Sequence, residues 1–229
     1  MKKIAVICPS RSRPNNIKEV ISSFNDCKSS LSDIYFVIDS DDTSNYEKYT
    51  SNIGIIKYEK NNDSRGVVAP MNYGASKLSK QYEYLYFMGD DHRFRTKDWD
   101  NIFVENMNAM DNIGIIYPND LLQGSMLASS HLISSNIVKI LGHFYNPIFT
   151  HLCSDNSIMS IGHGLNRIKY LENVVIEHLH PFSGKSQWDD LYRTVNSENM
   201  NKKDREAWHN WSQNIYPHEI EKLKKELKI

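Results

Sequence analysis

The sequence predicts an α/β fold in which a mostly parallel sheet is flanked by helices, followed by a mixed second half and a helical C-terminal tail. Two observations support this prediction. Across residues 4–117, short β-prone segments alternate with segments that carry apolar side chains at helical spacing, which is typical of parallel strands joined by crossover helices. The chain of 229 residues is 40% hydrophobic, which is enough for one large domain with a full core.

The predicted strands are short apolar segments that are rich in β-branched or aromatic residues and bounded by Gly, Pro, Asp or Asn. They cover residues 4–8, 34–38, 53–58, 84–88 and 113–117. Helices are expected between them. Residues 14–24 and 70–80 each begin with a proline at a first-turn position, and residues 97–110 carry apolar side chains at helical spacing.

Beyond residue 117 this alternation ends, and we expect a mixed region that builds the second wall of a cleft. Helices are predicted at residues 134–141 and 154–162, with a loop that contains Gly and Pro between them. Strand-like segments follow at residues 167–171 and 174–178. The polar segment 202–229 then predicts one or two amphipathic helices.

Composition and charge indicate no membrane segment and no general affinity for polyanions. The formal net charge is -1, from 27 Lys and Arg against 28 Asp and Glu. The N-terminal apolar stretch is brief and lacks the cleavage site of a signal peptide. The three cysteines are isolated and lack metal-type spacing, so we expect free thiols and a cytoplasmic location.

The most informative segment follows the predicted strand at residues 84–88 and contains Asp90, Asp91 and His92. Ligands of an open α/β sheet bind at the carboxyl ends of its strands. Adjacent carboxylates repel each other and are costly to bury unless a cation or hydrogen-bond donors compensate. The segment therefore predicts a divalent metal held against a diphosphate, which indicates a nucleotide site.

Polar segments also end the first two predicted strands. Residues 9–13, Pro-Ser-Arg-Ser-Arg, place hydroxyl and guanidinium groups just before a helix N-terminus, as a nucleotide diphosphate requires, although a solvated and capped loop fits the same residues. After the second strand, Asp39 is placed to accept hydrogen bonds from a base N–H or from ribose hydroxyls. Asp41 and Asp42 fit an Asx turn equally well.

A weaker motif precedes the helix at residues 70–80. Arg65 and Gly66 come just before this helix, and Asn72 and Gly74 lie in its opening turns. The glycines permit close approach and Arg65 is suited to neutralise phosphate, but a lone surface arginine is the commoner explanation.

Ionisable residues also appear in the second half. His178 and His180 end the last strand-like segment and project to the same side, so that one is suited to a metal site and the other to an ordinary hydrogen-bonded histidine. Asp155 starts a predicted helix, where N-capping and a functional role explain it equally well.

Taken in order, these motifs resemble those of GT-A-type nucleotide-sugar glycosyltransferases, broadly of the family-two kind. The shared pattern is strand-Pro-Ser-Arg, strand-Asp, an Asn-x-Gly helix, Gly-Asp-Asp-His, a later Asp and a terminal histidine, and its specificity lies in the order. The resemblance implies a Rossmann-like GT-A domain over residues 1–182, with a nucleotide-binding half (1–117) and an acceptor or catalytic half (118–182). Residues 183–229 would form a helical extension.

The resemblance also implies a role for each motif. Donor-binding residues would be Pro9, Ser10, Arg11, Arg13, Asp39, Arg65, Asn72 and Asp90. Asp91 and His178 would hold the metal, and Asp155 would be the catalytic base. His92 departs from the family pattern, which has an aspartate there; it is a further candidate ligand, and Asp90 with His92 is an alternative pair. With imidazole ligands, Mn²⁺ becomes more attractive than Mg²⁺.

The implied activity is transfer of a sugar from a nucleotide-diphosphate donor, with a UDP-sugar favoured, to an acceptor hydroxyl. A divalent cation with Arg11 or Arg65 would balance the charge of the leaving diphosphate. Asp155 would take the proton of the acceptor as the anomeric centre inverts. The acceptor stays open among a saccharide, a protein hydroxyl and a modified DNA base.

Two other functions are also compatible with the sequence. Residues 39–43 and 89–91, each after an apolar strand, resemble motifs of haloacid-dehalogenase-type phosphatases, in which an aspartate attacks phosphorus beside Mg²⁺. That interpretation leaves the Pro-Ser-Arg loop, Asp155 and His178 without a role. A non-catalytic module that binds nucleotide sugars would keep the fold without turnover.

Overall fold

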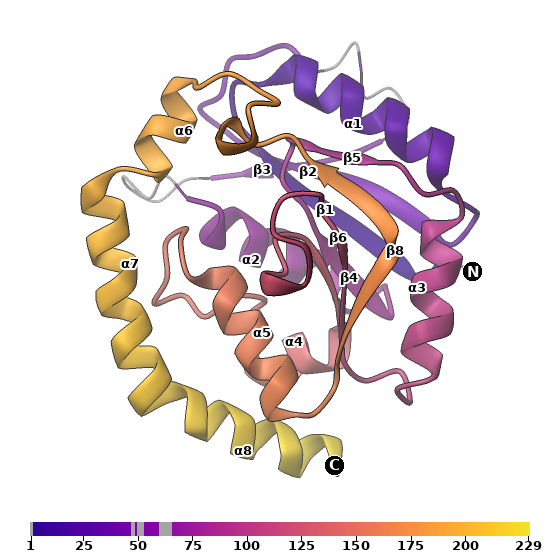
Figure 1. The fold of residues 1–229 in the computed structure, drawn as a ribbon, viewed down its shortest axis with the longest axis vertical. Coiled ribbons are helices and arrows are strands. Elements are labelled where there is room, and N and C mark those ends of the chain that lie inside the picture. Colours follow the sequence, from indigo (N-terminus) through magenta and orange to yellow (C-terminus); the bar gives the residue numbers. More distant parts are fainter. Residues whose placement is uncertain (1, 47–48, 50–52, 60–65) are drawn as a thin grey trace.

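The computed structural model describes residues 2–46, 49, 53–59 and 66–229, which build one mixed sheet with helices on both faces (Figure 1). Its strands are β1 (Ile4–Ser10), β2 (Ser32–Asp39), β3 (Gly54–Tyr58), β4 (Tyr84–Phe87), β5 (His92–Phe94), β6 (Ile115–Asn119), β7 (His131–Ser134) and β8 (Ile168–His178). Across the sheet their order is β3-β2-β1-β4-β7-β6-β8-β5.

The two halves of the sheet differ in strand direction. β1 pairs in parallel with β2 and β4, and β2 pairs in parallel with β3. In the second half, β7 runs antiparallel to both β4 and β6, β6 and β8 are parallel, and β5 is antiparallel to β8. The predicted parallel first half and mixed second half are therefore confirmed.

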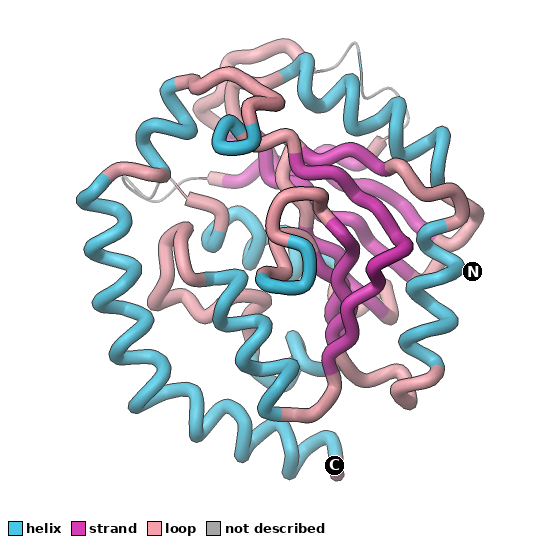
Figure 2. The backbone as a smooth tube through the Cα atoms, viewed as in Figure 1, coloured by secondary structure: helices cyan, strands magenta, loops and turns pink. Residues whose placement is uncertain are grey.

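Helices cover both faces of this sheet (Figure 2). They are α1 (Pro14–Cys27), α2 (Val68–Leu78), α3 (Trp99–Asn108), α4 (Ser135–Leu141), α5 (Ser154–Gly164), α6 (Asp190–Val195), α7 (Glu198–Asn210) and α8 (Tyr216–Leu227). The last three follow one another around one edge of the molecule, and a π-helical turn (Trp211–Ile215) joins α7 to α8 (Figure 1).

Two hydrophobic cores lie on the two faces of the sheet because successive side chains of a strand point to opposite sides. Along β1, Ile4 and Val6 enter the core that α1 and α3 cover, whereas Ala5 and Ile7 enter the core that α2, α4, α5 and α8 cover. All four are fully buried. This burial on both faces explains the uninterrupted apolar sequence of the strand.

Most predicted elements are present, and the differences have physical reasons. The helix predicted from residue 70 begins at Val68. The strand-like segments 167–171 and 174–178 are one continuous strand, β8, whose pairing with β6 shifts register between Pro118 and Asn119. The sequence did not reveal β5, β7 or α6, which have three, four and six residues and are too short to show a periodic pattern.

The C-terminal helices pack closely against the rest of the chain. Trp211 and Leu223 are fully buried in the core that also contains α5. The Trp211 indole and the Asn146 amide both donate to the carboxylate of Glu219, at 2.9 and 2.7 Å. None of the helices in the described ranges combines the length and apolar content that crossing a bilayer requires.

Candidate active site

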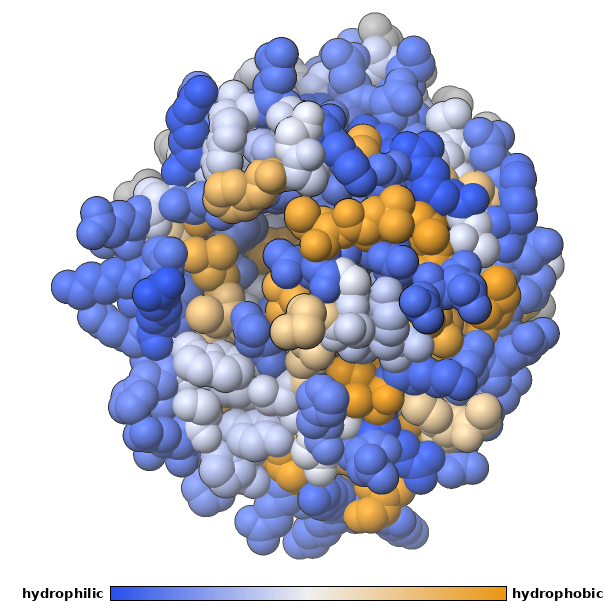
Figure 3. Space-filling model, in the orientation of Figure 1, coloured by the Kyte–Doolittle hydropathy of each residue, from blue (hydrophilic) through white to orange (hydrophobic). Residues whose placement is uncertain are grey.

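A cavity of about 290 Å³ opens at the carboxyl ends of β1, β2 and β4. Its walls also include the first turn of α5 and one side of α6. Nine of the predicted site residues line it: Pro9, Ser10, Arg11, Arg13, Asp39, Asp90, Asp91, His92 and Asp155. On the face shown in Figure 3, apolar side chains gather over β8 and the segment between β6 and β7. Exposed Leu121 and Met126 belong to that segment.

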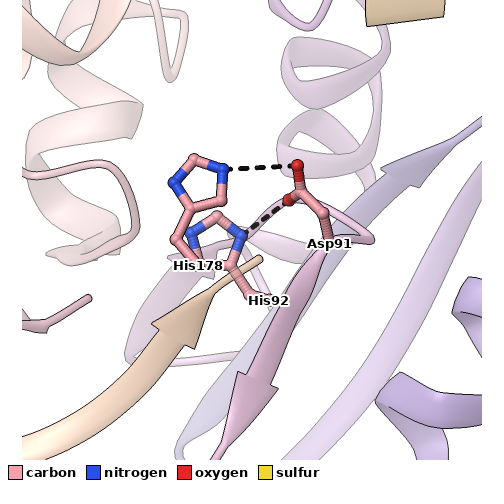
Figure 4. A group of neighbouring side chains, drawn as sticks. All are labelled: Asp91, His92 and His178. Atoms are coloured by element: carbon pink, nitrogen blue, oxygen red, sulfur yellow. Dashed lines mark hydrogen bonds and ion pairs between the residues drawn. The ribbon is translucent and has the colours of Figure 1, made fainter. Parts of the chain in front are cut away.

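Asp91, His92 and His178 form the only group of metal-ligating type found in the described part of the chain, with one candidate ligand atom from each within 4.8 Å of the others (Figure 4). We call this group the Asp–His trio. His92 begins β5 and His178 ends β8, and the pairing of these strands places the two residues directly opposite each other. Their rings stack with centroids 4.1 Å apart.

Hydrogen bonds hold the trio together. Nδ1 of His92 donates to Oδ1 of Asp91 at 2.9 Å, and Nε2 of His178 donates to Oδ2 at 3.2 Å. Gly89 makes room for this arrangement, because a Cβ there would lie 2.5 Å from Oδ1 of Asp91. The glycine of the Gly-Asp-Asp-His motif is therefore a steric requirement of the site.

Burial and charge act in opposite directions on the trio. Burial favours a raised pKa for Asp91, but the charge and hydrogen bond of His178, with those of His92, hold this pKa well below its ordinary value. Burial lowers the pKa of His92. Burial also acts to lower the pKa of His178, yet the charge of Asp91 raises it overall. A cation that took the place of the His178 proton would meet the same negative charge.

The trio fits a divalent cation. Nδ1 of His92 and Nε2 of His178 both face the carboxylate of Asp91, so three donor atoms converge on one space (Figure 4). A metal held there would lie between the carboxylate and the two imidazoles, in place of their hydrogen bonds. One carboxylate and two imidazoles form a donor set that suits Mn²⁺.

Asp90 faces away from the trio and anchors the first loop. The Ser10 hydroxyl donates to Oδ2 of Asp90 at 2.6 Å, and Nη1 of Arg13 donates to Oδ1 at 3.0 Å. Burial raises the pKa of Asp90; Arg13 opposes the increase and the charge of Asp91 adds to it. The two adjacent carboxylates therefore have different partners, and the geometry groups His92 with Asp91 rather than with Asp90.

The two arginines of the first loop are paired with carboxylates. Arg11 bonds to Asp39 at 2.7 Å and to both oxygens of Asp41, at 2.5 and 3.0 Å. Arg13 also makes a bidentate pair with Asp189, at 2.7 and 2.8 Å, and its guanidinium lies 4.0 Å from the centre of the Tyr192 ring. Both guanidiniums are thus oriented by the protein itself.

Asp155 lies across the cavity as the second residue of α5. The Tyr145 hydroxyl is 3.3 Å from its Oδ1. Burial raises the pKa of Asp155 to about 7, against the opposing effects of the Tyr145 hydrogen bond and the charge of His178. A carboxylate with a pKa near neutrality in a cleft is suited to general-base catalysis.

Two of the other predicted residues do not line the cavity, and the third is not described by the structure. His178 contacts Asp91 but is not among the residues that line the cavity. Asn72 is also absent from the lining, and its amide is bonded to the backbone of Phe144 and Tyr145. Arg65 lies outside the described residues.

Several site residues escaped the sequence analysis. The Tyr192 hydroxyl donates to Oδ2 of Asp91 at 2.7 Å, and Asp189 holds Arg13. His151 lines the cavity on a loop that Asp204 fastens. The signal shared by Asp189, Tyr192 and Asp204 is the polar and aromatic content of residues 186–204, which alone does not show where that segment folds back.

Comparison with solved structures identifies similar folds. TarS of S. aureus in complex with UDP-GlcNAc has a TM-score of 0.68 at 13% identity, over 98% of this chain and 71% of that chain. Glucosyl-3-phosphoglycerate synthase from Mycobacterium tuberculosis, in complex with Mn²⁺, UDP and phosphoglyceric acid, has a TM-score of 0.59 at 10% identity, over 90% and 78% of the two chains. The mannosyltransferase PcManGT from Pyrobaculum calidifontis, in complex with GDP-Man and Mn²⁺, has a TM-score of 0.55 at 10% identity, over 96% and 72%.

No protein-family model and no curated protein matches the sequence. At these low identities the structural similarity establishes the fold alone. The Rossmann-like GT-A architecture that the order of motifs predicted is confirmed.

Proposed function

We propose that this chain is a metal-dependent glycosyltransferase that moves a sugar from a nucleotide-diphosphate donor to an acceptor hydroxyl with inversion at the anomeric carbon. One observation carries the proposal: Asp91 and His92 of the Asp–His trio line the same cavity as Asp155, whose pKa is about 7. Groups for a cation and a proton acceptor thus face one space at the carboxyl ends of a GT-A sheet.

The proposed metal site is the Asp–His trio. Asp91, His92 and His178 would hold the ion, with Mn²⁺ favoured over Mg²⁺. When bound, the ion would neutralise charge on the diphosphate as it leaves the sugar. The Tyr192 hydroxyl, already bonded to Asp91, orients the carboxylate.

The proposed donor site is the first loop and the end of β2. Ser10, Arg11, Arg13 and Asp39 line the cavity there, and the arginines supply positive charge for phosphate oxygens. A UDP-sugar is favoured because TarS and glucosyl-3-phosphoglycerate synthase were both crystallised with uridine nucleotides.

The proposed catalytic base is Asp155. Near neutral pH a substantial fraction of this carboxyl is ionised, so that it accepts the proton of the acceptor hydroxyl while the hydroxyl oxygen attacks the anomeric carbon. Such general-base assistance contributes about 10²–10⁴-fold to rate.

The phosphatase alternative has less support. It requires Asp39 to act beside a metal at Asp91, but Asp39 is paired with Arg11 and is absent from the Asp–His trio. A non-catalytic nucleotide-sugar-binding module keeps the same fold and differs only in turnover.

The test needs no acceptor. We would incubate the protein with a panel of nucleotide sugars and Mn²⁺ and measure slow hydrolysis of each donor, with and without EDTA. We expect one donor to be hydrolysed, EDTA to abolish the reaction, and Asp91→Asn and His178→Ala to reduce it at least about 100-fold, since each removes a ligand. The matched control is His180→Ala, which removes a neighbouring histidine that is not part of the trio.

The outcomes separate the hypotheses. Metal-dependent donor binding in calorimetry without any hydrolysis or transfer would favour the binding module. Release of phosphate from an aryl phosphate, with no turnover of nucleotide sugars, would favour the phosphatase. Equal loss in the His178→Ala and His180→Ala variants would contradict the proposed metal site.

A further inference from the structure

Two buried polar side chains, His131 and Tyr145, lie behind Asp155 and have no role in the reaction as proposed above. Nε2 of His131, in β7, is 3.4 Å from the Tyr145 hydroxyl, and this hydroxyl is 3.3 Å from Oδ1 of Asp155. His131 and Tyr145 are completely buried. Three residues from separate parts of the chain thus form one line of contacts that ends in the cavity.

The tautomer of His131 follows from its other contact. Nδ1 lies 2.9 Å from the backbone carbonyl oxygen of Ala128. A carbonyl oxygen only accepts hydrogen bonds, so Nδ1 carries the proton. Burial lowers the pKa of His131 to about 4, which keeps the ring neutral at physiological pH. Nε2 is therefore an acceptor that needs a donor.

The Tyr145 hydroxyl stands between two acceptors and has one proton. When Asp155 is ionised, this proton is drawn to the carboxylate, and Nε2 of His131 has no donor. When Asp155 is protonated, its O–H donates to the oxygen of Tyr145, the Tyr145 O–H donates to His131, and His131 donates to Ala128. Every group in the chain has a partner only in the second state.

We propose that His131 is a positioning residue for Asp155 that acts through Tyr145: it accepts a hydrogen bond from the Tyr145 hydroxyl whenever Asp155 takes up a proton, and so it stabilises the protonated form of the base. The inference rests on the proposed function, in which Asp155 must take a proton. It adds a third residue, which does not touch the cavity, to the control of that step.

In the proposed step, each bond that forms is matched by a bond that breaks. The O–H bond of the acceptor breaks as its oxygen bonds to the anomeric carbon, and the proton passes to the Asp155 carboxylate. The Tyr145 hydroxyl rotates from Asp155 to His131, so no proton leaves Tyr145 or His131. The leaving diphosphate carries the electron pair of the broken glycosidic bond.

Within the described ranges, two other charged groups act on Asp155. His178, at the end of β8, favours the ionised form of Asp155, whereas Asp120, which follows β6, favours the protonated form. Cys153 precedes Asp155 and has a raised pKa through burial, so it stays neutral near pH 7. His131 differs from these groups because it is linked to Asp155 by hydrogen-bond contacts through the Tyr145 hydroxyl.

Two substitutions of His131 test the roles of its two ring nitrogens one at a time. His131→Asn keeps an amide donor near the position of Nδ1 but has no acceptor near that of Nε2, whereas His131→Gln extends an amide to the position of Nε2. We expect His131→Asn to lower the pKa of Asp155 by about 0.5–1 unit, since it removes one hydrogen bond from the protonated state. His131→Gln should restore most of this shift.

The measurement is the pH titration of the Asp155 carboxyl ¹³C resonance in the unliganded protein, assigned by its loss in Asp155→Asn. In a Tyr145→Phe background, His131→Asn should have no further effect, because the path between the two residues is already broken. An unchanged Asp155 pKa in His131→Asn, or an equal shift with and without Tyr145, would overturn the proposal.

A measurement on the wild-type protein covers the case in which His131→Asn does not fold. The ¹⁵N resonance of His131 Nε2 should change with the same pH midpoint as Asp155, and this change should vanish in Asp155→Asn. A resonance that stays constant across that pH range would overturn the proposal. Neither measurement needs a donor or turnover, so failure of the proposed glycosyltransferase activity is detected separately, in the hydrolysis assay.

Discussion

Asp155 shows at the scale of one residue how burial raises the pKa of a carboxyl group at the expense of stability above that pKa. Its pKa rises from an ordinary value of 3.8 to about 7 because burial penalises the charged form. The folded protein therefore binds the Asp155 proton more tightly than the unfolded chain does. The resulting stability is fully present below pH 3.8 and is lost as the pH rises through 7.

This sign leads to a prediction for Asp155→Asn. The amide resembles the protonated acid and does not ionise, so the variant should unfold at higher urea than the wild type at pH 8, by up to about 4 kcal/mol. At pH 4 the difference should nearly disappear. The measurement is urea denaturation at both pH values, and a variant that is less stable than the wild type at pH 8 would contradict the explanation.

The sequence was informative about which residues carry charge and less so about how they group. Asp90, Asp91 and His92 were identified from their place after a strand, but two ligand pairings stayed open. In the structure, the turn after β4 directs Asp90 to Ser10 and Arg13 and directs Asp91 to the histidines. Such a choice depends on tertiary partners that lie about 80 residues away.

At the scale of elements, α7 fixes a loop of the cavity that has no regular structure. Asp204 on α7 is completely buried and accepts hydrogen bonds from the backbone N–H groups of Thr150, His151 and Leu152, at 2.8, 2.8 and 2.7 Å. His151 and Leu152 line the cavity. One carboxylate on a remote helix therefore shapes this wall of the site.

We expect Asp204→Asn to destabilise the protein by about 2–4 kcal/mol, because an amide NH₂ would replace an oxygen that accepts from buried N–H groups. Urea denaturation measures the loss. The matched control is Asp190→Asn, which removes a fully exposed carboxylate and should change stability by less than about 0.5 kcal/mol. Similar losses in both variants would argue against a capping role for Asp204.

Apolar periodicity predicts long elements of this fold but not its shortest strands. Six of the eight strands of the sheet and most helices were predicted because each has enough residues for an apolar pattern. The pairing of β5 with β8 places His92 beside His178, yet β5 has three residues and no pattern of its own. Its strand conformation comes from the partner strand, which one sequence segment does not reveal.

At the scale of the whole molecule, the C-terminal segment contributes hydrogen bonds to the candidate site. Residues 183–229 were predicted as a helical extension of a domain that ends at residue 182. Within this segment, Tyr192 donates a hydrogen bond to Asp91 and Asp189 accepts hydrogen bonds from Arg13. Asp204 accepts hydrogen bonds from the backbone of the loop before α5. They also bury Trp211 against the core.

A chain that ends at residue 182 tests this role. We expect it to bind no nucleotide sugar in calorimetry and to expose apolar surface, seen as aggregation or dye binding, because α8 and Trp211 no longer cover one core. A chain that ends at residue 227, which lacks only Lys228 and Ile229, is the control and should behave as the full chain. Normal donor binding by the shorter chain would show that residues 183–229 are a dispensable extension.

The hydrogen bonds of Tyr192 and Asp189 have a consequence for biosynthesis. Tyr192 and its partner Asp91 are 101 residues apart in the sequence, and Asp189 and its partner Arg13 are 176 residues apart. As the ribosome releases the chain from its N-terminus, Asp91 and Arg13 emerge long before these partners. A nascent chain that has not reached residue 192 therefore lacks the hydrogen bond from Tyr192 that holds Asp91, and this bond forms only late in translation.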